Sequence, residues 1–176
     1  LTHRPDLWGH LGIAREISAI TSYKFTEKKA KIEVPKKGSV PMVTVKNPKL
    51  CPRYMGLIIK GVKVAESPDW LKQRLQATGH SVISNIVDVT NYVMEEIGQP
   101  LHAFDLRNLE GGIVVHTAKK DEKIVTLDGE EKQLDPSILV IADEKKALAI
   151  AGVMGGEHSG IHADTVDILI ESANFD

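Results

Sequence analysis

Beyond residue 110 the chain is a series of short apolar segments, rich in β-branched residues and separated by glycine, aspartate or lysine. Short apolar runs of this composition predict strands, because buried helices need longer periodic segments. One segment turns at Asp128-Gly129, a dipeptide that favours a type I′ hairpin turn. We expect strands within residues 111–118, 123–134, 138–143, 147–152 and 166–172.

The first half of the chain has helical spacing instead. Residues 6–20 carry apolar side chains three and four positions apart, which predicts a helix. Residues 67–79 are bounded by helix signals, with Ser67 suited to the N-cap and Gly79 to the residue after the end. Pro68 then takes the first helical position.

A third helix is expected from residue 85 until Gly98 and Pro100 end it. Its apolar residues recur at gaps of three, four and four, so one helical face is predicted to turn toward a core. These residues are Ile86, Val89, Val93 and Ile97.

Two further strands are expected within residues 42–47 and 53–64, so strands outnumber helices. The helices gather in the first half and do not alternate regularly with strands. The predicted fold class is therefore α+β, with a mixed or antiparallel sheet, a few packed helices and an N-terminal helical segment.

Composition excludes several classes of function. Aromatic residues make up 5% of the chain and the net charge is −2, which argues against a domain that mainly coats nucleic acid. The single cysteine, Cys51, excludes an internal disulfide and a cysteine-rich zinc site, and it fits a reducing cytoplasm. No apolar run is long enough to predict a membrane span.

Three parts are expected along the chain. Residues 1–20 form the tail of a preceding module, residues 21–40 a lysine-rich linker and residues 41–176 the main domain. The linker reads as solvated chain or as an arm that contacts RNA. Because the sequence starts without methionine, we expect it to be part of a longer protein.

The motifs of phosphate-binding loops, zinc proteases and serine hydrolases are missing from the sequence. A glycine-rich stretch, residues 148–160, follows a predicted strand and allows either a tight turn or close approach of a ligand. Glu171 lies in the last strand, on the face of Leu169 and Ala173, so it needs a partner. That partner is a structural salt bridge or a ligand.

His102 follows the helix break and lies between Leu101 and Phe104. His102 is either a core histidine whose ring nitrogens are hydrogen-bonded within the protein, or part of a small polar pocket with Thr90 and Asn91.

Several stretches, taken in order, closely resemble the β subunit of bacterial phenylalanyl-tRNA synthetase. They are "HRPDLWGHLGIARE", "NIVDVTNYVMEEIGQPLHAFD", "GGIVV", "TLDG", "LVIAD", "AGVMGGEHSG" and "ESANFD". The resemblance covers nearly the whole chain. It implies that residues from about 41 onward are the editing domain, the third and fourth modules of that subunit, which hydrolyses tyrosine mischarged onto tRNA(Phe).

The resemblance also implies roles for single residues. Glu171 corresponds to the acid that recognises the tyrosine hydroxyl, and Gly152 and Gly155 to the close-packed floor beside the aromatic ring. His102 corresponds, with Thr90 and Asn91, to the polar wall of the pocket. His102 is the candidate general base, although a binding role fits the sequence equally well. Asn174 departs from the aromatic or small apolar residue that relatives often carry there.

By the same resemblance, the partners are the tRNA(Phe) 3′ end carrying tyrosine and the α subunit of an α2β2 ligase. No metal and no cofactor are expected in this part, because ATP and magnesium serve aminoacylation in the complete synthetase. Cytoplasmic location without membrane association is implied too. The alternatives are a structural or RNA-contacting module with a vestigial pocket, and a free-standing editing factor.

Overall fold

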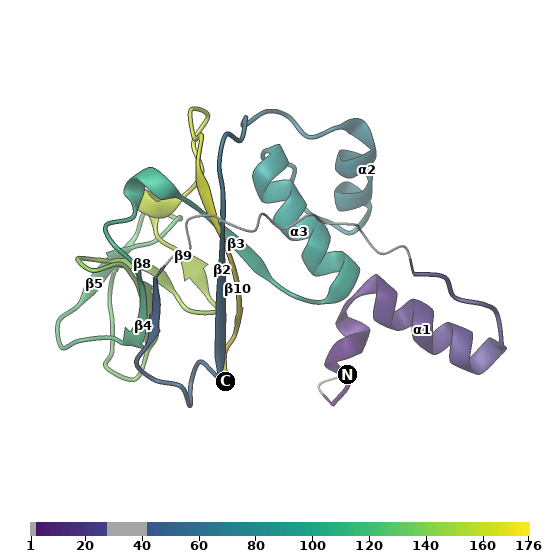
Figure 1. Ribbon diagram of the computed structural model, residues 1–176, viewed down its shortest axis with the longest axis horizontal. Helices are drawn as coiled ribbons and strands as arrows, with labels where there is room; N and C mark the ends of the chain where they lie inside the picture. The colour runs from purple at the N-terminus through teal and green to yellow at the C-terminus, as the bar shows by residue number, and fades with distance from the viewer. Residues whose placement is uncertain (1–2, 28–41) are drawn as a thin grey trace. The chain divides into compact units, whose positions relative to one another are not determined.

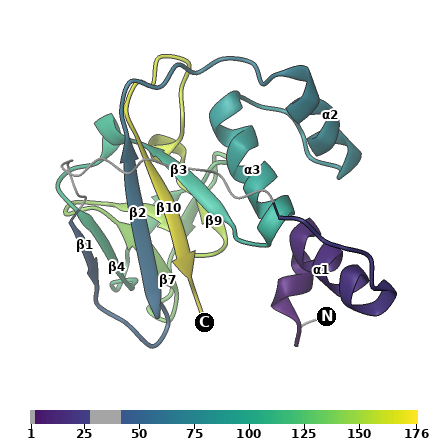
Figure 2. The same ribbon diagram turned by 45° about the vertical axis from the view of Figure 1, so that its right-hand side comes forward.

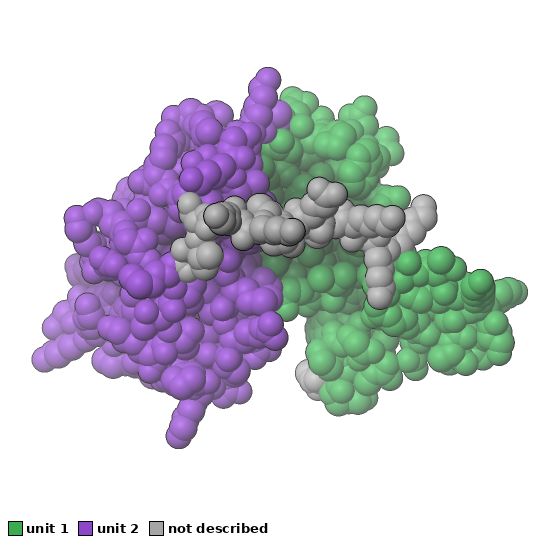
Figure 3. All heavy atoms as spheres, viewed as in Figure 1, with its two compact units in different colours: residues 1–39, 66–101 green, residues 40–65, 102–176 purple. Residues whose placement is uncertain are grey.

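The computed structural model describes residues 3–27 and 42–176. Most of the predicted linker, residues 21–40, therefore lies outside the described residues. The chain forms two compact units (Figure 3), each described here by itself. Unit 1 comprises residues 1–39 and 66–101, and unit 2 comprises residues 40–65 and 102–176. The predicted division at residues 20/21 and 40/41 stays a prediction.

Unit 2 is built from strands (Figure 1). A five-stranded sheet has the order β1 (Val43–Val45), β4 (Ile113–Thr117), β7 (Leu139–Ala142), β8 (Ala147–Ile150) and β9 (Met154–Gly155). The β1–β4 pair is parallel and the other pairs of this sheet are antiparallel. A two-stranded sheet joins β5 (Lys123–Val125) and β6 (Glu131–Gln133). Short 3-10 helices lie at η2 (Leu106–Asn108) and η3 (Glu157–Ser159).

A separate three-stranded sheet carries the candidate site. Its order is β2 (Arg53–Ile59), β10 (Ile168–Asn174) and β3 (Leu101–Asp105). Strands β2 and β10 run antiparallel side by side over seven residues each (Figure 2). Alternation along β2 turns every second residue inward.

The core of unit 2 consists of two apolar clusters. The first joins the three-stranded sheet to the five-stranded one through Phe104, Leu169, Val115 and Leu148. The second lies under the β5–β6 hairpin and includes Ile124, Leu134 and Val140. Burial of these side chains is the main favourable term in folding this unit.

Unit 1 is helical, with η1 (Pro5–Trp8), α1 (His10–Thr21), α2 (Asp69–Ala77) and α3 (Asn85–Ile97). Glycines bring its backbones together. A Cβ on Gly9 would lie 2.5 Å from the nitrogen of Gly98, and one on Gly12 would lie 1.5 Å from the carbonyl oxygen of Asp6. Side chains at these two positions are therefore excluded by contact with backbone.

The predicted α+β fold class is confirmed, and each predicted strand region contains a strand. The helix that was predicted to end at Gly98 does so, because Gly98 takes a left-handed φ of 77° and its N–H donates to Met94. In the part of the chain that the structure describes, no helix is long and apolar enough to cross a membrane.

The expected apolar face of α3 is wrong in part. Val89 and Ile97 are 49% and 48% exposed, while Asp88 on the same helix is fully buried. Asp88 accepts hydrogen bonds from the Ile83 N–H and the Ser67 hydroxyl. A polar contact thus anchors the start of α3, and apolar spacing alone did not indicate this.

Two local predictions need correction. Ser67 does not cap α2, because its hydroxyl is committed to Asp88, and Pro68 takes the N-cap position instead. The hairpin turn at Asp128-Gly129 is not type I′, because only Gly129 has a positive φ there. Asp128 keeps a negative φ, and its carboxylate accepts hydrogen bonds from the Thr126 hydroxyl and the Glu130 N–H.

Candidate functional site

Glu171 is a buried carboxylate in the middle of β10, with 7% of its surface exposed. Alternation along the strand places it on the same face as Leu169, which belongs to the core of unit 2. Burial raises the pKa of Glu171 to about 7, against the opposing effect of a hydrogen bond from Tyr54. The carboxyl group is therefore poised to titrate near neutrality.

The partner of Glu171 is a phenol. The hydroxyl of Tyr54 on β2 donates to Oε2 of Glu171 at 2.9 Å. Burial, with the neighbouring carboxylate, raises the pKa of Tyr54 above its usual value, so the phenol stays protonated and remains a donor. Among residues 3–27 and 42–176, no lysine, arginine or histidine pairs with Glu171, so the salt-bridged alternative is not what the structure has.

His102 on β3 lies in the same unit and is also largely buried. Its ring packs edge-on against Phe104, with 4.5 Å between ring centroids. Nε2 is buried and has no hydrogen-bond partner among the described residues. Burial lowers the pKa of His102, which favours the neutral imidazole at pH 7. A buried nitrogen of this kind can donate to or accept from a group brought in by a ligand.

The two glycines predicted for the site have different neighbours. A Cβ on Gly155 would lie 3.0 Å from Cε1 of His102, so a side chain here would make the imidazole move by a few tenths of an ångström. Gly152 adopts φ 69°, which favours glycine, and packs near the ring of Phe175 just after β10. The structure brings His102 and Gly155 together directly, and it places Gly152 beside the end of the strand that carries Glu171.

Thr90 and Asn91 lie on α3 in unit 1. The hydroxyl of Thr90 donates to the carbonyl of Val87 within its own helix at 2.7 Å, and Thr90 is buried. Asn91 is half-buried. Their convergence with His102 stays a prediction, as do the binding roles assigned to all these residues.

Tyr54 is the residue that sequence reasoning missed. It occurs in "CPRYMGLII", where alternate residues Tyr54, Gly56 and Ile58 face inward. That alternation was visible in the sequence and placed a phenol on the buried face. Its pairing with Glu171, 117 residues away, depends on strand register, which the sequence did not reveal.

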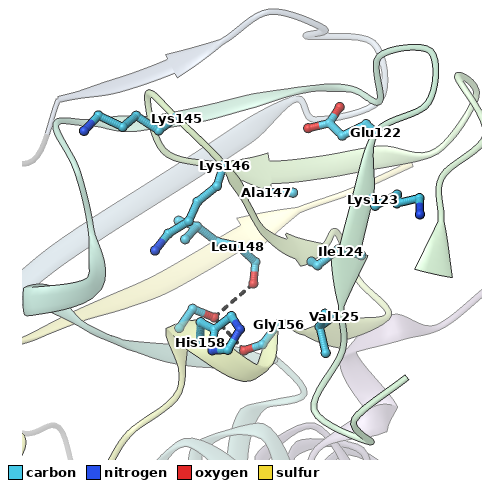
Figure 4. A pocket seen from close by; sticks show the side chains of 11 residues that line it. Glu122, Lys123, Ile124, Val125, Lys145, Lys146, Ala147, Leu148, Gly156 and His158 are labelled. Atoms are coloured by element: carbon cyan, nitrogen blue, oxygen red, sulfur yellow. Dashed lines mark hydrogen bonds between the residues drawn. The ribbon is translucent and has the colours of Figure 1, made fainter. Parts of the chain in front are cut away.

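A cavity of about 350 Å³ lies elsewhere in unit 2 (Figure 4). Ile124 and Leu148 form apolar parts of its lining, and Lys146 and His158 contribute polar groups. A second cavity, of about 510 Å³, lies in unit 1 among α1, α2 and α3. Glu171 lines neither of these two cavities. The candidate site is therefore assigned from its buried polar groups and not from a cavity.

Comparison with known proteins gives a family. The B3/4 domain family matches residues 50–176. The chain is 50% identical to the phenylalanine–tRNA ligase beta subunit of Aquifex aeolicus, and 49% identical to those of Carboxydothermus hydrogenoformans and Fusobacterium nucleatum. Each alignment covers 98% of this chain and 22% of the relative, so the chain spans about a fifth of their length.

A solved structure shares the fold. It is an N-terminal fragment of the phenylalanyl-tRNA synthetase beta-subunit from Pyrococcus horikoshii, with a TM-score of 0.60 and 19% identity. The match covers 98% of this chain and 53% of that one, and at this identity it shows the fold alone. The sequence is thus homologous over its whole length to phenylalanine–tRNA ligase beta subunits, and the chain belongs to the B3/4 domain family.

Proposed function

We propose that this chain is the editing part of a phenylalanyl-tRNA synthetase β subunit and hydrolyses tyrosine mischarged onto tRNA(Phe). The observation that carries the proposal is the buried Glu171, whose carboxylate is held by one phenol and by no cation among the described residues. The whole-chain homology to phenylalanine–tRNA ligase beta subunits supports the choice of substrate.

The chemical problem is the difference of one hydroxyl between tyrosine and phenylalanine. A wide apolar pocket would accept both amino acids and would destroy the correct product. A buried acceptor behaves differently, because phenylalanine leaves it unpaired at a cost of about 1–3 kcal/mol, and more for a charged group. Sites built around a substrate hydroxyl can reject the deoxy analogue by roughly 10⁴-fold or more. Glu171 supplies such an acceptor.

The reaction adds water across an ester. Water attacks the carbonyl carbon, the bond to the terminal ribose oxygen breaks, and that oxygen leaves with a proton as the tRNA hydroxyl. Neutral His102, with its unpartnered Nε2, can orient the water or accept its proton. Holding the ester and the water in line supplies much of the rate gain for an already activated ester.

Aminoacylation is assigned to other parts of the enzyme. We propose an α2β2 assembly with the α subunit in the cytoplasm, in which ATP and magnesium serve the charging reaction and this domain needs no cofactor. Gly152 and Gly155 then lie beside the aromatic ring of the substrate, while a binding role for Thr90 and Asn91 stays a prediction from the sequence.

The test uses the complete synthetase and purified Tyr-tRNA(Phe). Glu171→Ala should lower kcat/KM of deacylation by about 100-fold or more, because it removes the acceptor. His102→Ala should lower the rate as well, while charging with phenylalanine stays unchanged in both variants. Glu157→Ala is the matched control, since this glutamate is exposed on the same unit.

Wild-type deacylation in both site variants would overturn the proposal. It would favour the alternative of a structural or RNA-contacting module, for which salt-dependent binding of uncharged tRNA by the enzyme is the direct measurement.

A further inference from the structure

Tyr54 reaches Glu171 diagonally across two paired strands. In the β2–β10 register, Glu171 lies opposite Gly56, and Tyr54 lies opposite Ala173. Diagonal neighbours in a sheet are within reach of an aromatic side chain. The 2.9 Å hydrogen bond therefore follows from the register of two paired strands and not from a loop.

The residue directly opposite Glu171 has no side chain. Gly56 therefore contributes no side chain at the position directly opposite the carboxylate. Tyr54 occupies Oε2, and in the described parts of the chain no donor bonds to Oε1. An ionised carboxylate accepts up to four hydrogen bonds, so one oxygen remains available for a ligand.

The choice of a phenol as partner matters for recognition. An arginine would pair with both oxygens and compete with an incoming hydroxyl. A tyrosine hydroxyl donates a single hydrogen bond, restrains the side-chain rotamer and leaves the negative charge uncompensated.

We propose that Tyr54 is a positioning residue for specificity: it holds Glu171 through Oε2 so that Oε1 accepts the phenolic hydroxyl of tyrosine. The proposal rests on the proposed function of Glu171 as the acceptor. It adds that discrimination between tyrosine and phenylalanine depends on the phenol of Tyr54, which does not contact the ester of the substrate.

Few titratable groups of unit 2 face this carboxylate. Tyr54 contributes from β2, Cys51 from the segment before β2, and His102 lies on β3, the neighbour of β10. Burial raises the pKa of the Cys51 thiol and lowers that of His102, and Tyr54 is raised as well, so all three are neutral near pH 7. A pH dependence of tyrosine preference near neutrality therefore reports on Glu171.

The experiment compares deacylation of Tyr-tRNA(Phe) and Phe-tRNA(Phe) by the complete synthetase across pH 5.5–9. In the unsubstituted enzyme the ratio of the two kcat/KM values should rise with pH as Glu171 ionises. Tyr54→Phe should lower that ratio about 10-fold, as expected for one hydrogen bond to a charged group. It should also move the midpoint to higher pH, because the lost bond stabilised the ionised form.

Two variants make the outcomes distinct. Tyr23→Phe, at an exposed tyrosine in unit 1, should match the unsubstituted enzyme. Glu171→Ala removes the acceptor and should lose both the ratio and its pH dependence. If Glu171→Ala keeps the ratio, the proposed function and this inference both fail. If Glu171→Ala loses it and Tyr54→Phe does not, only the role of Tyr54 is overturned.

A purely structural role for Tyr54 would lower both deacylation rates together and leave the midpoint in place. Should Tyr54→Phe fail to fold by circular dichroism, 3-fluorotyrosine at position 54 gives a second route. This stronger donor should move the midpoint to lower pH, and an unmoved midpoint would overturn the inference.

Discussion

The two units bury their residues in different ways. Unit 2 has two apolar clusters, and its buried acids include Glu171 and Asp105, which accept hydrogen bonds from side chains. Unit 1 leaves most large apolar side chains of its first helical segment exposed, among them Trp8, Ile13, Ile17 and Ile20. In strand β10, Leu169 and Glu171 are thus buried on one face, as the alternation predicted. In the helices, only some of the apolar residues at helical spacing are buried.

The polar core of unit 2 also shows how position changes a carboxylate. Burial would raise the pKa of Asp105, but hydrogen bonds from Arg107 and Thr165 outweigh it and lower the pKa to about 2. Glu171 has one phenol donor and its pKa rises to about 7. The same functional group is an anion in one place and titrates near neutrality in the other, because Asp105 has several donors including the charged Arg107, while Glu171 has one neutral donor.

The units can be followed separately. Both tryptophans, Trp8 and Trp70, lie in unit 1, so intrinsic fluorescence reports on that unit. Far-UV circular dichroism reports on both units, including the strands of unit 2. Urea unfolding followed by the two signals therefore tests the comparison directly.

The largest expected effect is a core truncation in unit 2. Phe104 is fully buried, so Phe104→Ala should lower the free energy of unfolding by about 3–5 kcal/mol in the dichroism signal. The matched truncation in unit 1, Ile17→Ala, should stay within about 0.5 kcal/mol by fluorescence, because Ile17 is half exposed. If both truncations lower the free energy of unfolding by similar amounts, the contrast between the units fails, and the face of α1 that carries Ile17 is buried in solution.

The next effect concerns Glu171 and pH. Its pKa is raised from 4.5 to about 7 in the folded state, so the folded chain holds an extra proton in this window. Stability from this group is full below pH 4.5 and is lost as pH rises to about 7, by roughly 3 kcal/mol. Glu171→Gln should remove that decline and be more stable than the parent above pH 7. Unfolding in urea from pH 4.5 to 8.5 measures it.

Glu157→Gln is the control for that series, since this side chain is exposed in the same unit and should leave the decline unchanged. A parent chain whose stability is flat between pH 4.5 and 7 would contradict the burial of Glu171.

The smallest effect should be equal in the two units. Gly79 in unit 1 and Gly129 in unit 2 have φ values of 86° and 79°, and a Cβ at either would meet nothing within 4 Å. Alanine at each should cost about 1 kcal/mol, from backbone strain alone. Calorimetric melting of both variants sharpens the comparison, because a much larger loss at one of them would reveal a packing difference between the units.

Much of the fold could be predicted from the sequence. The strand segments after residue 110 and the helix end at Gly98 depend on local composition, and each was confirmed. Two local predictions were wrong. The Ser67 hydroxyl bonds to Asp88 and does not cap the helix, and the Asp128 carboxylate bonds to Thr126 within the turn at Gly129. Local propensity describes what a segment favours in isolation and not which hydroxyl another segment needs.

Part of the candidate site was also within reach. Alternation predicted that Glu171 faces the core, and the helix break led directly to His102. The sequence could not reveal the Tyr54–Glu171 hydrogen bond, the orphaned Nε2 of His102 or its contact with Gly155. Each of these depends on how distant strands align.

The sequence by itself determined the order and type of the elements, the glycines that end or bend them and the inward position of Glu171, because these follow from interactions among near neighbours. Only the tertiary structure decided that, within the described residues, a phenol and no cation holds that carboxylate and that its pKa rises to about 7. The reason is physical: desolvation and partner geometry are set by atoms that are distant along the chain and meet only when the strands pair.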